Sequence, residues 1–103
     1  MELENKLRET MINAAVKTLE DASLPAIVKD ECAGMMRNYL EVQDNGYFHP
    51  MATPELKAEL SVGVMGKIIP LLTKYNVPTK DGQNLHRGLY VAFGGNLSDV
   101  EME

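Results

Sequence analysis

The chain has 103 residues, which is enough for one domain and too few for a second independent core. Hydrophobic residues make up 45% of it and charged residues 24%, and these proportions are typical of a folded globular protein and argue against disorder. The formal net charge of −5 opposes non-specific binding to nucleic acid and to anionic membranes, so we expect neither as a partner.

The first residues and the cysteine content predict a cytoplasmic location. The chain begins with the charged residues Glu2, Glu4, Lys6 and Arg8, where a secretory signal would lead into an apolar run. A single cysteine, Cys32, cannot form an internal disulfide, and this fits a reducing compartment. No stretch approaches the ~18 apolar residues of a membrane-spanning helix.

Residues 2–22 have the spacing of an amphipathic helix. Apolar side chains recur there every three or four residues, which places them along one side of a helix. The opposite side carries charged and amide side chains, and neither glycine nor proline interrupts the segment. The apolar positions are Leu3, Leu7, Met11, Ala15, Leu19 and Ala22.

A second amphipathic helix is predicted over the apolar positions of residues 27–42. Ser23 is a good N-cap residue for it, and Pro25 is tolerated in a first helical turn. Its end is predicted at residues 44–46, where Asn45 or Gly46 offers a left-handed C-cap. Because the link to the first helix is short, the two helices should pack as an antiparallel hairpin.

The loop predicted over residues 43–53 carries an aromatic cluster. Aromatic and methionine side chains are enriched at protein interfaces, so Tyr47, Phe48, His49 and Met51 are candidate partner-binding residues. The alternative, which we favour, is that these side chains fold inward and close the end of the bundle.

A third helix is predicted to begin at Pro54, with Thr53 as its N-cap. Between residues 62 and 72 its only charged side chain is Lys67. A helix that is apolar over more than half its circumference is usually the central one of a small bundle, and we expect this position for it.

Pro70 interrupts the pattern of this third helix. Proline lacks a backbone N–H and its ring clashes with the carbonyl four residues back, at Gly66. We therefore predict a kink or a break between Lys67 and Pro70. Gly63, Gly66 and Pro70 share one narrow stripe, which predicts the close approach of another backbone.

Residues 77–82 form a turn by composition, and a short helix follows, with an apolar face at Leu85, Leu89 and Phe93. A strand over residues 89–93 is the alternative. Residues 97–103 are predicted to be a frayed acidic tail. The sequence thus predicts an all-α domain over residues 1–96, a small bundle of four or five helices with the third kinked or broken near Pro70.

Cations gather around the turn that leads into the fourth helix. Helix N-termini present free N–H groups that suit a phosphate, and an aromatic ring can stack on a base. The candidate anion-binding residues are Lys74, Lys80, His86, Arg87 and Tyr90. The alternative is an ordinary solvated loop with surface cations, and we favour it.

Catalytic and metal-binding patterns do not stand out. The histidines His49 and His86 and one cysteine are too few for a zinc site without carboxylates, so we expect no metal and no cofactor. Cys32 falls on an apolar helix face, where a free cysteine usually packs as a small hydrophobic residue. Ser61 and Ser98 have no histidine near them in sequence to act as a base.

These patterns predict a non-catalytic helical interaction module. We expect a small acidic regulator or inhibitor, of the kind found among phage and mobile-element accessory proteins, that binds a protein partner or self-associates as an oligomer. The alternative function is a binder of a small anionic ligand, such as a nucleotide, through the basic region of residues 74–90.

Overall fold

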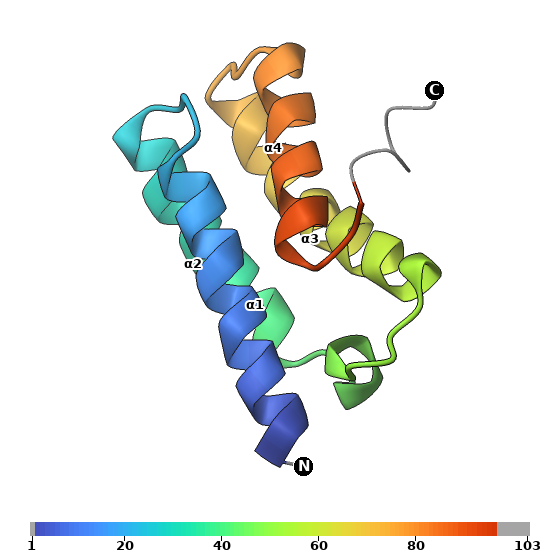
Figure 1. The fold of residues 1–103 in the computed structure, drawn as a ribbon. Helices are drawn as coiled ribbons and strands as arrows, with labels where there is room; N and C mark the ends of the chain where they lie inside the picture. Colours follow the sequence, from blue (N-terminus) through green and yellow to red (C-terminus); the bar gives the residue numbers. More distant parts are fainter. Residues whose placement is uncertain (1, 97–103) are drawn as a thin grey trace.

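The computed structural model of the chain describes residues 2–96. Four α-helices make up most of this part: α1 (Glu2–Glu20), α2 (Ala26–Glu41), α3 (Pro54–Lys74) and α4 (Thr79–Ala92). A short 3-10 turn, η1 (Asn45–Phe48), lies between α2 and α3 (Figure 1). No strand occurs in the described residues, so the all-α prediction is confirmed.

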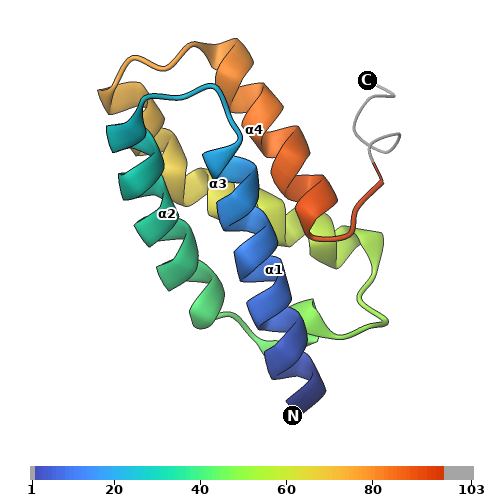
Figure 2. The ribbon, with the colours of Figure 1, turned by 60° about the vertical axis from the view of Figure 1, so that its left-hand side comes forward.

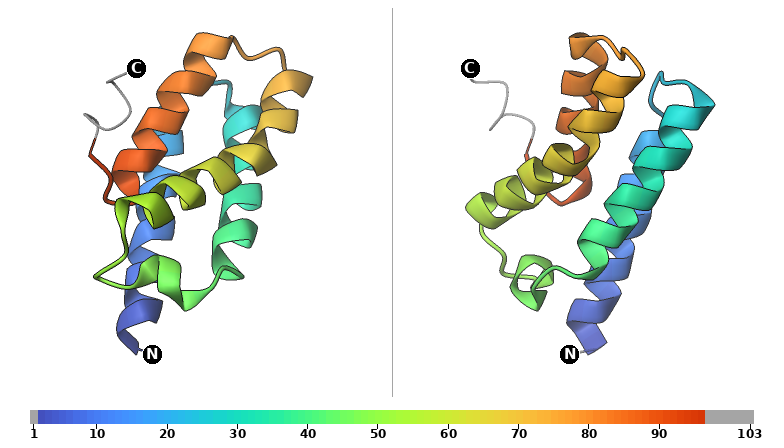
Figure 3. Two further views of the ribbon diagram at one scale, coloured as in Figure 1. Left: turned by 90° about the vertical axis from the view of Figure 1, so that its right-hand side faces the viewer. Right: turned by 180° about the vertical axis from the view of Figure 1, so that it is seen from behind.

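The four helices form a closed ring. Each contacts the next one in sequence, and α1 also contacts α4, as Figure 2 shows. Seen from behind, in the right panel of Figure 3, α1 and α2 make one pair and α3 and α4 the other. The Cα radius of gyration is 13.1 Å, close to the ~13 Å of a compact chain of about 100 residues.

The core lies inside this ring and consists of apolar side chains at helical spacing. Each helix contributes its inward stripe, and η1 adds one aromatic ring from the end of the bundle at which α1 begins (Figure 1). The predicted packing of Cys32 in the core is confirmed. The most buried members are Ala15, Leu19, Val28, Cys32, Met36, Leu40, Phe48, Leu60, Val64, Ile68, Leu85, Leu89 and Phe93.

The N-terminus of α3 was predicted correctly, whereas that of α2 was not. The hydroxyl oxygen of Thr53 accepts a hydrogen bond from the backbone N–H of Leu56 at 3.2 Å, which makes Thr53 the N-cap of α3. Ser23 does not cap α2. That helix begins later, at Ala26, and extended Pro25 occupies the N-cap position without a side-chain hydrogen bond.

The end of α2 also differs from the prediction. The helix ends at Glu41, and neither Asn45 nor Gly46 adopts a left-handed conformation. Instead the Asp44 carboxylate accepts a hydrogen bond from the Gly46 N–H at 2.8 Å and starts η1. A local side-chain bond thus turns the loop into a 3-10 turn.

Left-handed residues end α3 and α4. Asn76 has a φ of 55° and Gly94 a φ of 91°, and each lies just after its helix. Beyond Asn76, the Val77 N–H donates back to the Leu72 carbonyl at 2.9 Å. This closing bond satisfies a carbonyl of the last turn and directs the chain sharply into α4.

Helix α3 runs without a break through Pro70, so of the predicted kink or break the break does not occur. Its path bends along its length in the left panel of Figure 3. Both Pro70 and Gly66 are exposed, which leaves the freed Gly66 carbonyl open to water.

Helix α4 begins at Thr79 and continues to Ala92. It includes most of residues 89–93, so the strand alternative is wrong. The predicted tail, residues 97–103, lies outside the described residues.

Candidate functional site

An apolar groove of about 470 Å³ runs between α3 and α4. Its α3 wall is mostly aliphatic, and its α4 wall adds polar groups, among them His86. Apolar hollows with a few polar side chains are the usual form of a binding site. The groove is lined by Val62, Met65, Gly66, Ile69, Leu72, Thr73, Val77, Pro78, Thr79, Gly82, Gln83 and His86.

The groove opens onto the outward face of α3, and this face is also apolar. The side chain of Val62 is 59% exposed and that of Ile69 is 50% exposed. Gly66 lies between them on the same side of the helix.

The prediction that α3 is the central helix is wrong, because it contacts α2, α4 and η1 but not α1.

A second groove, of about 390 Å³, lies on the other side of α3, against α2. Its walls include Met35 of α2, Val42 just after that helix, and Lys67 of α3. Beside it, Tyr39 lies over Gly63 so closely that a Cβ atom at Gly63 would overlap the Tyr39 phenol. The close approach predicted at Gly63 is therefore that of a side chain and not of a backbone.

In the wall of the groove between α3 and α4, His86 contacts a buried serine, an interaction that the sequence did not predict. The Nε2 atom of His86 lies 3.3 Å from the hydroxyl oxygen of Ser61, which is itself buried. Burial lowers the pKa of His86, and the nearby charge of Arg87 lowers it further. The two side chains are 25 positions apart, so only the packing of α3 against α4 brings them together.

In this geometry the Ser61 hydroxyl is directed at a backbone carbonyl. The Ser61 hydroxyl donates its proton to the Ala58 carbonyl at 3.0 Å, and its oxygen is then free to accept from His86. A general base would need to accept the serine proton instead. The contact therefore joins α3 to α4 and fixes the histidine in the wall of the groove.

The five candidate anion-binding residues do not form one site. Lys74, Lys80 and Arg87 are exposed, and helical spacing puts Lys80 and Arg87 on one side of α4, away from the groove. His86 faces the groove. Tyr90 is only 3% exposed, so its ring cannot stack on a ligand, and this part of the prediction is wrong.

The aromatic loop closes one end of the bundle. Phe48 is fully buried, so it cannot contact a partner, and the favoured inward interpretation is confirmed for this residue. Tyr47 is half-buried and packs against the core. Of the four candidate partner-binding residues, only His49 and Met51 are exposed, and the His49 Nδ1 atom accepts a hydrogen bond from the Met51 N–H at 3.0 Å.

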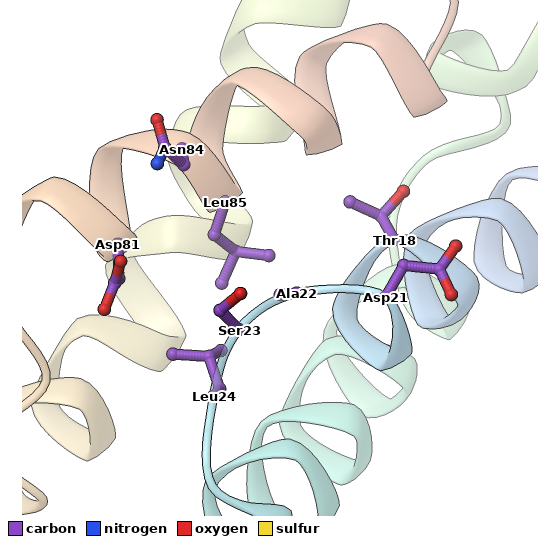
Figure 4. A pocket seen from close by; sticks show the side chains of 8 residues that line it. All are labelled: Thr18, Asp21, Ala22, Ser23, Leu24, Asp81, Asn84 and Leu85. Carbon is purple, nitrogen blue, oxygen red and sulfur yellow. The ribbon is translucent and has the colours of Figure 1, made fainter.

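A polar hollow of about 370 Å³ lies between the α1–α2 link and the start of α4. In Figure 4 the Leu85 side chain points from α4 towards the link, and Asp21 and Asp81 lie on opposite sides of the hollow. Asp21 is also paired with Lys17 at 3.6 Å. Within residues 2–96 no group of three histidine, cysteine or acidic side chains could hold a metal ion.

In comparisons with known proteins, no family model, no curated protein and no solved structure matches the chain. None of the helices in the described part of the chain is long and apolar enough to cross a membrane.

Proposed function

We propose that the chain is a non-catalytic interaction module, a small acidic regulator or inhibitor, that binds a protein through one surface of α3. This α3 surface consists of Val62, Gly66, Ile69 and Thr73 together with the adjoining groove against α4. The observation that carries the proposal is the exposure of this uncharged helix face beside an apolar groove.

The solvent-facing side of a helix normally carries charged and polar side chains. Isolated exposed aliphatic residues need no explanation, whereas a cluster of them beside a hollow is typical of an interaction site. Val62 and Ile69 are two turns apart on the same side of α3 and together line the groove. Covering them would remove about 1 kcal/mol or more of unfavourable hydration for each side chain.

The shape of the groove favours a helical partner over a small ligand. It lies open between two helices joined by a short turn, and an amphipathic helix commonly occupies such a groove through residues at helical spacing. The alternative function, capture of a small anion by residues 74–90, has less support. Of its five candidate residues only His86 lines the groove, and Tyr90 is buried.

The test compares two isoleucines of similar exposure. Ile69 of the α3 surface is 50% exposed and Ile27 of α2 is 54% exposed. A photo-crosslinking residue is placed at position 62, inside the α3 surface, and the chain is irradiated in the cells that make it. We expect a discrete cross-linked species, which is lost in the Ile69→Glu variant and retained in the Ile27→Glu variant.

Circular dichroism first confirms that both variants keep the helical fold. Equal loss in the two variants, or no cross-linked species at all, would overturn the proposal.

A further inference from the structure

We infer that the partner bound by the α3 surface is a second copy of this chain, with the two α3 helices packed antiparallel about a twofold axis near Gly66. The inference rests on the proposed function, since it names the occupant of the same surface. It is carried by the order of charges along α3 and by the open space at Gly66.

The outward face of α3 changes charge along its length. Helical spacing places Glu55 and Glu59 on the same side of the helix as Val62, Gly66 and Ile69, and both glutamates are exposed. At the other end, the exposed Lys74 closes the helix at the edge of this face that is nearer α2. The face is therefore acidic at its start and uncharged in its middle, and Lys74 flanks its end.

This order of charges is self-complementary only in one orientation. Glu59 precedes Gly66 by about as many residues as Lys74 follows it. A twofold axis near Gly66 therefore brings Glu59 of each copy close to Lys74 of the other, as an isologous interface requires. A parallel pair would place glutamate against glutamate and lysine against lysine.

Gly66 gives a second, independent argument. A Cβ atom at this position would meet nothing within 4 Å, so the fold of the single chain does not require a glycine there. Glycine inside a helix is unfavourable relative to alanine. A glycine at the centre of an exposed apolar face allows the backbone of a second helix to approach closely.

The remaining charge of this segment lies on the same edge of α3 as Lys74. Lys67 lines the groove against α2, to the side of the α3 surface. Val62 and Ile69 border the groove against α4. Across the twofold axis, each copy can thus insert its own aliphatic side chains into the groove of the other.

Sedimentation equilibrium of the whole chain measures the pairing. We expect a monomer–dimer equilibrium that Gly66→Leu weakens at least ~10-fold, since the added side chain separates the helices by several ångströms. Gly34→Leu is the matched control. Gly34 is an exposed glycine of α2 with equally open space, and its substitution should leave the dimer constant unchanged. Equal effects of the two substitutions would overturn the inference.

A charge exchange tests the orientation. Glu59→Lys and Lys74→Glu should each weaken the dimer by about 3- to 10-fold, because each creates like-charge contacts at two symmetric places. The double variant should return to within about twofold of the wild type. Additive weakening in the double variant would show that the two side chains do not meet.

Symmetric cross-linking tests the position of the axis. In a Gly66→Cys variant the new thiols of two copies lie next to each other, and mild oxidation should give a disulfide-linked dimer. The buried Cys32 stays unreactive, and Gly34→Cys is the control that should form no disulfide-linked dimer.

The outcomes separate this inference from the proposed function. A chain that stays monomeric up to ~1 mM, the weak limit of association, would overturn the inference. If Ile69→Glu still abolished the cross-linked species in cells, the α3 surface would bind a different protein and the proposed function would stand. If that loss were also absent, both would fall.

Discussion

The guanidinium of Arg8 lies over the ring of Phe48, with its carbon 4.3 Å from the ring centroid. The same side chain donates hydrogen bonds to the Leu40 carbonyl at 2.7 Å and to the Asn45 side-chain oxygen at 2.5 Å. Arg8 therefore joins α1 to the last turn of α2 and to η1. A cation at a helix C-terminus donates hydrogen bonds to carbonyls that have no partner within the helix, and it is attracted by the negative end of the helix dipole.

Replacing Arg8 should destabilise the whole bundle. Arg8→Ala loses the bonds to Leu40 and Asn45 and uncovers Phe48, and we expect the free energy of unfolding to fall by about 2–3 kcal/mol. Arg8→Lys keeps the charge but not the forked geometry, and should cost about 1–2 kcal/mol. Urea denaturation measures both values. Arg37→Ala, at an exposed site of α2, should stay within about 0.5 kcal/mol of the wild type.

The contact of α1 with α4 depends on Gly88. A Cβ atom there would lie 2.7 Å from the Thr18 methyl carbon. That methyl group is fixed, because Thr18 is β-branched and its hydroxyl donates to the Ala14 carbonyl at 2.8 Å. Gly88→Ala should therefore cost about 1–3 kcal/mol of stability, although alanine is the better helix former.

Thr18→Ser should rescue Gly88→Ala in thermal denaturation, since serine lacks the methyl group and keeps the hydroxyl. Gly34→Ala, where the space is open, should instead stabilise the chain by about 0.5–1 kcal/mol. Failure of the rescue would mean that some other contact limits the space at Gly88.

His86 should make stability depend on pH. Burial, and then the charge of Arg87, hold its pKa in the folded chain below the ordinary value of 6.5. Below about pH 6.5 the unfolded chain therefore binds more protons at His86 than the folded chain does. The free energy of unfolding falls as the pH falls below this value. His86→Gln can keep a hydrogen bond to Ser61 without titrating.

The measurement is urea denaturation of the wild type and of His86→Gln between about pH 7.5 and 5. The wild type should lose more stability than the variant on acidification, while the carboxylates contribute equally to both. Parallel pH profiles would contradict the assignment of this dependence to His86.

Cys32 should be inert in the folded chain. Its side chain is fully buried, and burial raises the pKa of the thiol to about 11, so almost no thiolate is present at neutral pH. A disulfide reagent such as Ellman's reagent should label it only through unfolding, at a rate that rises steeply with urea. Rapid labelling without denaturant would show that α2 opens locally.

The helices could be predicted from the sequence because burial imposes their periodicity, and all four occur where apolar positions recur. Helix ends were harder to predict. Thr53 acts as expected, since only a local side-chain bond is needed there. Ser23 and Gly46 do not, because Pro25 and Asp44 impose other backbone conformations.

The candidate site was less accessible from sequence. Whether the face of α3 with Val62 and Ile69 points inward or outward depends on where α2 and α4 pack, and periodicity alone does not decide this in so apolar a helix. The contact of His86 with Ser61 joins residues from two different helices. The sequence shows that Tyr90 is aromatic, but the burial of its side chain depends on tertiary packing and could not be predicted from local spacing.

The closure of the ring has a consequence for biosynthesis. Of the four helices, α1 leaves the ribosome first and α4 last, yet the two pack against each other. One flank of α1 thus stays uncovered until α4 has emerged, and the native topology forms only at the end of translation of this segment.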